Sequence, residues 1–176
     1  MSDVAQRMTG RLQVYSGDGK GKTTAALGLA LRAVGAGLRV FIAQFAKGRD
    51  CSELASLRRL GIEVRPCGRP DFIRDQPTAA DLDAARRGLE EARLALAGGQ
   101  FDVVILDEAN IAVHYGLFTV NELLAALAQR AASVEVVVTG RWAHPKLVEV
   151  ADLVTEMREI KHYYHDGVPA RKGIED

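Results

Sequence analysis

The nine residues Ser16–Thr24 read SGDGKGKTT and directly follow the apolar run Leu12-Gln-Val-Tyr15. A helical pattern begins at about Lys22 and continues toward Gly35, so this stretch is expected to join a strand to a helix. The first N–H groups of a helix have no partner within it, and together with the helix dipole they attract anions. The stretch therefore predicts a loop that holds phosphate groups between the first strand and the first helix.

The residue types of this loop suit a nucleotide with several phosphates. Its glycines allow positive φ angles and let the backbone approach phosphate oxygens closely. Lys22 supplies a positive charge, and the hydroxyl of Thr23 is a ligand for Mg²⁺ in this motif. The strict P-loop pattern has glycine where this chain has Ser16. Gly21-Lys22-Thr23, with a strand before and a helix after, still favours nucleotide binding over a chance glycine-rich turn.

Two further segments are expected to reach the same edge of the sheet as the loop. The apolar run Val103–Leu106 is followed by Asp107 and Glu108, and in P-loop proteins a carboxylate here completes the magnesium site, usually through water. The alternative is that Asp107 and Glu108 are ordinary polar residues of the turn that follows the strand. Arg141 follows the run Val134–Thr139 and would reach the carboxyl edge, where doubly wound folds bind ligands. It is expected to contact phosphate, with a surface salt bridge as the alternative.

Short apolar runs alternate with longer helical patterns along the chain, which is typical of a parallel sheet covered by crossover helices. We expect one doubly wound α/β domain over residues 1–176, with a P-loop and a mainly parallel sheet of five to six strands. The expected strands are Leu12–Tyr15, Arg39–Gln44, Ile62–Arg65, Val103–Leu106, Val134–Thr139 and Leu153–Met157.

Helix boundaries are marked by capping patterns. Thr78 and Asp81 predict a capping box ahead of an apolar stripe that ends at Gly98-Gly99, and Thr119 with Glu122 predicts another. The second helix is expected to turn Leu123, Leu124, Leu127 and Ala131 inward. The last residues, 161–176, lack strong periodicity and are expected to lie on the surface.

The composition narrows the range of partners. Lysine plus arginine number 23 and aspartate plus glutamate 23, so no overall positive field favours nucleic acid or an anionic membrane. The two cysteines are too few for a disulfide framework and are interpreted as free thiols in a reducing cytosol. No signal-peptide pattern and no stretch of eighteen apolar residues occurs, so a soluble, cytoplasmic protein is expected.

These residues alone leave the reaction open. Glu108 is able to polarise a water, which keeps an ATPase or a small kinase possible, although no second domain or long lid carrying arginines is visible. A nucleotide-gated binding module without chemistry of its own is a further alternative.

The chain resembles the ATP:corrinoid adenosyltransferases of the cobalamin pathway, and the resemblance extends in order over nearly its whole length. The segments that carry it are Gly17–Ala26, Gln44–Gly48, Ile105–Glu108, Tyr115–Leu117, Val138–Arg141, Ala151–Met157, Lys161-His162 and Lys172–Glu175. The carboxyl-terminal segments are far more specific than a phosphate loop.

The resemblance implies a transferase that uses ATP, Mg²⁺ and a corrinoid (cobalamin, cobinamide or cobyrinic acid diamide) in adenosylcobalamin biosynthesis or salvage. In this family the triphosphate lies reversed in the loop. Reduced cobalt(I) attacks the 5′ carbon of the ribose, and intact triphosphate leaves. An electron donor for the cobalt and a homodimer are also implied.

The resemblance also assigns roles to single residues. It implies that ATP is held by Gly17, Asp18, Gly19, Lys20, Gly21, Lys22, Thr23, Thr24 and Arg141. The catalytic residues would be Lys22, Thr23 and Glu108, and the Mg²⁺ ligands Thr23, Asp107 and Glu108. Phe72 and His162 are candidates for contacting the corrinoid, the alternatives being simple packing for Phe72 and a surface or capping role for His162. Family members can carry asparagine where this chain has Asp18.

Overall fold

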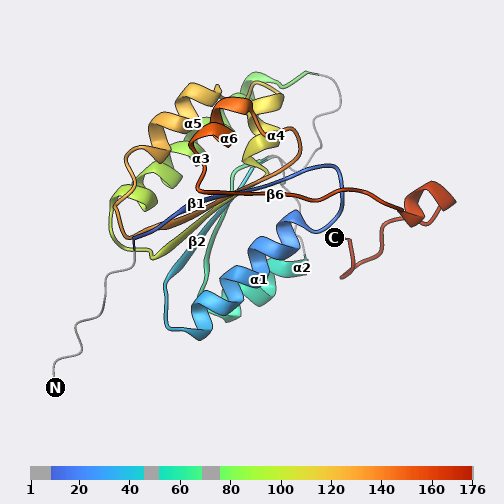
Figure 1. Ribbon diagram of the computed structural model, residues 1–176, viewed down its shortest axis with the longest axis horizontal. Helices are drawn as coiled ribbons and strands as arrows, with labels where there is room; N and C mark the ends of the chain where they lie inside the picture. The colour runs from blue at the N-terminus through green and yellow to red at the C-terminus, as the bar shows by residue number, and fades with distance from the viewer. Residues whose placement is uncertain (1–8, 46–51, 69–75, 176) are drawn as a thin grey trace.

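Six apolar segments form the strands of one sheet in the computed structural model, which describes residues 9–45, 52–68 and 76–175 (Figure 1). All neighbouring strands pair in parallel, in the order β3-β2-β4-β5-β1-β6. The strands are β1 (Leu12–Ser16), β2 (Val40–Gln44), β3 (Glu63–Pro66), β4 (Val103–Asp107), β5 (Glu135–Thr139) and β6 (Leu153–Glu156). The expected parallel α/β fold is confirmed, and each predicted strand matches an observed one to within one residue at either end.

Helices cover both faces of the sheet. Figure 1 shows α1 and α2 on one face and α3, α4, α5 and α6 on the other. Their bounds are α1 (Lys22–Gly35), α2 (Ser52–Arg59), α3 (Ala79–Ala97), α4 (Ala109–His114), α5 (Val120–Leu127) and α6 (Pro145–Val150).

Both predicted capping boxes are confirmed. Thr78 accepts a hydrogen bond from the backbone of Asp81 at the start of α3, and Thr119 does the same with Glu122 at the start of α5. Helix α5 is shorter than its apolar pattern suggests, because it ends at Leu127. Ala131 therefore lies beyond the helix, although it still packs against the core.

Strand residues alternate between two apolar layers, as the period of two in a strand requires. Val104 and Leu106 of β4 pack in the layer beneath α3–α6, whereas Val103 and Ile105 pack in the layer beneath α1 and α2. Because both faces of the central strands are buried, the sequence of these strands is almost continuously apolar. The two layers fix the sheet rigidly, and its carboxyl edge carries the site.

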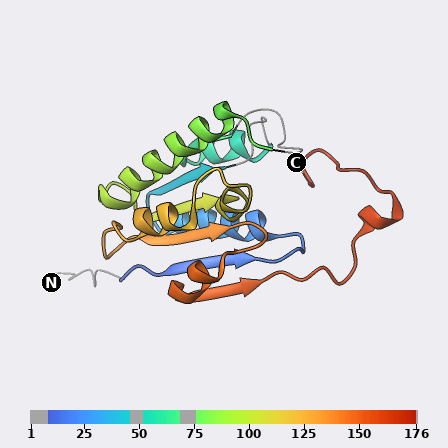
Figure 2. The same cartoon turned by 90° about the horizontal axis from the view of Figure 1, so that it is seen from above.

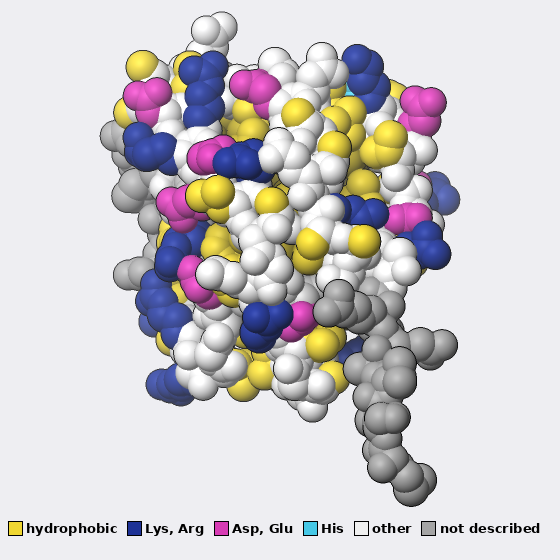
Figure 3. All heavy atoms as spheres, turned by 90° about the vertical axis from the view of Figure 1, so that its left-hand side faces the viewer, with side chains coloured by type: hydrophobic (Ala, Val, Ile, Leu, Met, Phe, Trp, Pro, Cys, Tyr) yellow, Lys and Arg dark blue, Asp and Glu magenta, His cyan; other side chains and the backbone are white. Residues whose placement is uncertain are grey.

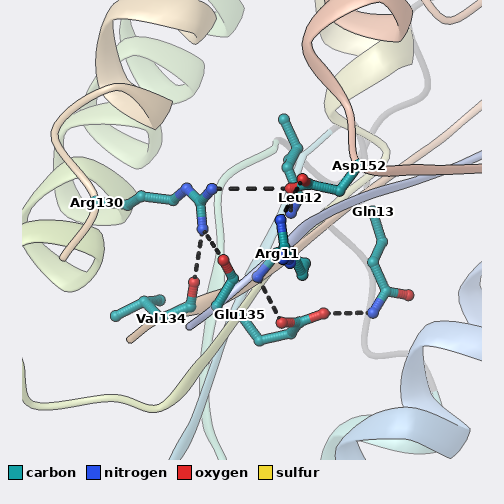
Figure 4. A network of polar contacts seen from close by, with 8 residues as sticks. Arg11, Leu12, Gln13, Arg130, Val134, Glu135 and Asp152 are labelled. Carbon is teal, nitrogen blue, oxygen red and sulfur yellow. Dashed lines mark hydrogen bonds and ion pairs between the residues drawn. The ribbon is translucent and has the colours of Figure 1, made fainter. Parts of the chain in front are cut away.

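The amino ends of β1, β5 and β6 are joined by a polar network (Figure 4). Asp152 accepts hydrogen bonds from the backbone N–H of Leu12 at 2.8 Å and from the guanidinium of Arg11 at 3.0 Å. Glu135 accepts one from the backbone of Arg11 at 2.7 Å, and Arg130 lies 3.9 Å from Asp152. This network holds the register of the edge strand β6 at the end of the sheet opposite the loop.

The face that carries these amino ends bears acidic and basic side chains of both signs (Figure 3), in keeping with the balanced charge of the sequence. None of the helices in the described residues is long and apolar enough to cross a membrane.

The segment after β6 extends beyond the carboxyl ends of the strands before it turns back (Figures 1 and 2). It contains one short 3₁₀ helix, η1 (Tyr163–Asp166). At its return, the ammonium of Lys20 donates a hydrogen bond of 3.0 Å to the carbonyl of Ile174. The carboxyl-terminal segment thus comes back to the predicted phosphate loop.

Candidate active site

The loop between β1 and α1 passes very close to the chain that leaves β6. The N–H of Gly19 donates a hydrogen bond of 2.7 Å to the carbonyl of Met157. A Cβ added to Gly17, whose φ is +97°, would lie 2.4 Å from that carbonyl oxygen, and one added to Gly19 would lie 2.8 Å from it. Glycine is therefore required here by the neighbouring backbone as well as by any phosphate. Met157 is a partner that sequence reasoning did not identify.

Lys22 lies at the amino end of α1 and is only 7% exposed. Its ammonium donates hydrogen bonds of 2.7 Å to the carbonyls of Gly17 and Gly19. Burial lowers the pKa of Lys22, with a further lowering from Arg141, against the opposing effects of Glu108 and Asp18. A buried ammonium whose pKa is lowered lacks full compensation by anions, so this position favours the binding of a negatively charged ligand.

Asp107, the last residue of β4, gathers polar groups from three other elements and is 1% exposed. Its Oδ1 accepts hydrogen bonds from the hydroxyls of Thr23 at 2.8 Å and Thr139 at 2.7 Å. Gln44, at the end of β2, lies 3.4 Å from Oδ2. Thr139 also accepts a hydrogen bond of 3.0 Å from the backbone N–H of Glu108. The structure thus brings the predicted pair Thr23 and Asp107 together.

Glu108 stands at the junction between β4 and α4 in the left-handed region of backbone space, with φ 59° and ψ 21°. This conformation is uncommon for residues other than glycine and persists where the surroundings impose it. It places Glu108 beside the loop, on the wall of a cavity at this edge of the sheet.

The side chains of Thr23, Asp107 and Glu108 carry oxygen atoms, the kind of ligand that a magnesium ion takes. Mg²⁺ prefers hard oxygen ligands and keeps several waters, so it is commonly held by only one or two carboxylates plus substrate phosphates. In the described residues no group of three or more His, Cys, Asp or Glu side chains is placed to hold a metal ion. Such a donor set suits a hydrated cation that arrives with a nucleotide.

A cavity of about 920 Å³ opens over this edge of the sheet. Its walls come from the loop, from α1, α2 and α4, from the turn after β5, and from the carboxyl-terminal segment. The predicted site residues that line it are Asp18, Gly19, Lys20, Gly21, Lys22, Thr23, Thr24, Glu108, Arg141 and His162. Gly17 belongs to the same loop, Asp107 is buried against Thr23, and Phe72 lies outside the described residues.

Three of these side chains have partners that bear on their predicted roles. Asp18 faces Arg141, with 4.0 Å between Oδ1 and Nε, so the alternative of a salt bridge for Arg141 is observed, at the cavity. Contact of Arg141 with phosphate stays a prediction. His162 caps η1 by accepting a hydrogen bond of 3.0 Å from the backbone of Tyr164, and it also borders the cavity. A capping role and a ligand contact are therefore compatible for His162.

Several residues of the cavity wall were not identified from the sequence as site residues. Ser52, Glu53 and Ser56 come from α2, which was not predicted, while Ile111, Tyr115 and Trp142 come from α4, the turn that follows it and the turn after β5. Of these residues, Trp142 could have been predicted to lie at the site, because it directly follows Arg141.

The fold and the site together define the class of this protein as a parallel α/β protein with a P-loop at the carboxyl edge of its sheet. A family model described as ATP:corrinoid adenosyltransferase BtuR/CobO/CobP matches residues 8–175. The chain therefore belongs to this family.

Curated relatives agree with the family match. A corrinoid adenosyltransferase of Pseudomonas aeruginosa is 40% identical over 169 residues, which are 94% of this chain and 83% of that protein. The corrinoid adenosyltransferase of Escherichia coli strain K12 is 38% identical over 172 residues, covering 97% of this chain and 88% of that protein. The protein named corrinoid adenosyltransferase CobA of Salmonella typhimurium is 37% identical with the same coverage.

Proposed function

We propose that this protein transfers the 5′-deoxyadenosyl group of ATP to the reduced cobalt of a corrinoid and releases triphosphate. The observation that carries the proposal is the meeting of the Lys22 loop with the Thr23–Asp107 pair at one cavity, in a chain of this family. A loop built for several phosphates, with oxygen ligands for Mg²⁺ beside it, is what a triphosphate leaving group requires.

Binding of the triphosphate falls to the loop. The N–H groups at the start of α1 and the ammonium of Lys22 supply positive charge where negative charge grows as the leaving group departs. Thr23, Asp107 and Glu108 would hold Mg²⁺, which supplies Lewis-acid stabilisation of the phosphate oxygens when bound. Asp107 keeps the Thr23 hydroxyl in place, and Thr139 in turn fixes Asp107.

The proposed reaction forms one bond and breaks another. The electron pair of cobalt(I) forms the cobalt–carbon bond to C5′, and the bond between C5′ and its oxygen breaks with its electrons passing to triphosphate. The corrinoid itself is the nucleophile, so the protein needs only to position the two substrates and stabilise the charge of the leaving group. The carboxyl-terminal segment, which forms part of the cavity wall, would limit access of water.

Several finer features remain part of the proposal. We infer that residues 1–176 act as one domain, which the single sheet supports, and that the protein works in the cytoplasm with a separate electron donor for cobalt. A homodimer is proposed on the edge strand β6, where Leu153 and Val154 are each 44% exposed at the rim of the sheet (Figure 2). Sedimentation velocity of the wild type beside a Val154→Lys variant tests this, because the variant is expected to shift the protein toward monomer.

The proposed activity is tested by mixing the protein with ATP, Mg²⁺ and chemically reduced cobalamin in the absence of oxygen. The corrinoid spectrum is expected to change to that of an alkylcobalamin, and exposure to light should then convert it to the spectrum of cobalt(II) cobalamin, because light cleaves the cobalt–carbon bond homolytically. Omission of ATP is the control. If the corrinoid spectrum stays unchanged while ATP is consumed, the protein is an ATPase or kinase instead; if neither changes, a binding module is favoured.

A further inference from the structure

Trp142 presents an aromatic ring at the cavity next to the groups that would hold ATP. It directly follows Arg141, lines the cavity and is 48% exposed. Its ring packs on that of His114, with 4.1 Å between centroids and 36° between planes. A large aromatic side chain that keeps half its surface exposed contributes less to the core than its size allows, so core packing alone does not account for it.

The backbone at Trp142 adds a second observation. Its φ is 55°, in the left-handed region, which for a bulky residue is an outlier that costs free energy. Asparagine or glycine would adopt this conformation at lower cost. A strained, half-exposed aromatic residue at a cavity wall is therefore better explained by a ligand than by stability.

We infer that the indole of Trp142, supported from behind by His114, stacks on the adenine of bound ATP. The inference rests on the proposed function, which places the triphosphate on the loop. With phosphates at Lys22, the nucleoside must occupy the remainder of the cavity. The lining of the cavity includes the polar residues Ser52, Glu53 and Ser56 from α2, and it also includes Trp142 with Ile111 and Tyr115 from α4 and the neighbouring turns.

The shapes of ATP and of the corrinoid decide which of the two substrates lies on Trp142. A purine is flat and has two open π faces, and stacking on an aromatic side chain is favourable for any base. A corrin ring is puckered and carries amide side chains on both faces, so it offers an indole less flat surface than a purine does. Since His114 already covers part of the Trp142 ring, the open part offers one flat surface, which suits adenine.

Fluorescence tests the stacking directly, because Trp142 is the only tryptophan of the chain. The protein is titrated with Mg²⁺–ATP and, separately, with Mg²⁺–triphosphate, with excitation at the red edge of the tryptophan absorption. ATP is expected to quench the emission strongly, and triphosphate is expected to bind with little quenching. Equal quenching by both ligands would overturn the inference, because triphosphate has no base.

Two substitutions separate stacking from folding. Trp142→Gly removes the ring while easing the left-handed backbone, so the variant is expected to fold. It should raise the Kd for ATP about five- to hundredfold and leave the Kd for triphosphate within about twofold, both measured by calorimetry. Trp142→Tyr should regain most of the affinity for ATP. An unchanged Kd for ATP in Trp142→Gly, or an equal loss for ATP and triphosphate, would contradict stacking.

Failure of this inference is distinguishable from failure of the proposed function, because the binding measurements contain no corrinoid. If Trp142→Gly weakens ATP selectively while the wild type forms no alkylcorrinoid, the stacking stands and the proposed function fails. If the wild type is active and Trp142→Gly raises only the KM for the corrinoid, Trp142 contacts the corrinoid and the inference is wrong.

Discussion

The hydroxyl of Thr23, in the first turn of α1, donates a hydrogen bond of 2.8 Å to Oδ1 of Asp107 at the end of β4. The two residues are 84 positions apart in the chain, and the parallel sheet brings them together at its carboxyl edge. This contact links the phosphate loop to the carboxylates that follow the apolar strand. The proposed magnesium site depends on this hydrogen bond.

Asp107→Asn should weaken the site, since it removes the negative charge that orients Thr23 and attracts the cation. We expect adenosylation to fall about tenfold to a hundredfold, the range seen when groups that support a metal ligand are changed. The Mg²⁺ concentration for half-maximal activity should rise. Thr139→Val, which removes one donor to Asp107 and the acceptor of the Glu108 N–H but keeps the charge of Asp107, is the comparison variant with a smaller expected effect. Equal Mg²⁺ dependence in Asp107→Asn and wild type would refute the role.

Lys22→Ala should abolish adenosylation. Its ammonium is the buried positive charge of the loop, and loss of a group that stabilises developing charge costs about a hundredfold or more in rate. Circular dichroism is expected to show an intact fold. Lys146→Ala on α6, where the lysine contacts Asn121 at 3.3 Å, is the control and should retain activity. Wild-type turnover in Lys22→Ala would show that the loop does not hold the triphosphate.

Gly140 lies in close contact with its neighbours and has a positive φ, so its substitution should destabilise the protein more than that of an uncrowded glycine. Its φ is +127°, and an added Cβ would lie 3.0 Å from Cβ of Asn110 and 3.2 Å from Oε2 of Glu108. Gly140→Ala should lower the free energy of unfolding by about 1–3 kcal/mol and lower activity by displacing Glu108. Gly99→Ala, at φ +65° with nothing within 4 Å, carries no close contact and only the milder strain of the left-handed region. Urea unfolding compares the two, and equal losses would mean that the close contact does not matter.

The stability of the carboxyl-terminal segment should depend on pH through Glu175. Hydrogen bonds from Arg171 and from the Tyr163 hydroxyl hold the pKa of Glu175 at about 2, below the ordinary 4.5. Since the pKa is depressed in the folded protein, the stabilisation is present above about pH 4.5 and is lost as the pH falls through about 2. Carboxyl NMR should show Glu175 still ionised at pH values where other glutamates protonate. Arg171→Leu should move its pKa back toward the ordinary value, and an ordinary pKa in the wild type would contradict the contact.

Most of the fold was predictable because the strands are buried on both faces. Val103–Leu106 and the other central runs are short and almost continuously apolar, which predicts strands buried on both faces. The capping boxes at Thr78 and Thr119 mark the starts of two helices from local sequence alone. Helix α2 was missed because it is short and its buried face rests on Leu54 and Leu57 alone. Its contribution to the cavity wall was missed with it.

The candidate site was predictable where residues stand at strand ends. Parallel strands present their carboxyl ends at one edge, and this rule predicts Asp107, Glu108 and Arg141 beside the loop, where the structure has them. Contacts that depend on side-chain direction were not predictable. Asp18 turns to Arg141 and Lys20 to the carbonyl of Ile174, and neither direction follows from spacing along the chain.

The identity of the phosphate product tests the proposed reaction most directly. The protein is incubated with ATP and Mg²⁺, with and without reduced corrinoid, and the products are identified by phosphorus NMR. We predict intact triphosphate, formed only when the reduced corrinoid is present and in an amount equal to the alkylcorrinoid. ADP and inorganic phosphate formed without the corrinoid would show that the bond broken lies between phosphorus and oxygen, and would contradict adenosyl transfer.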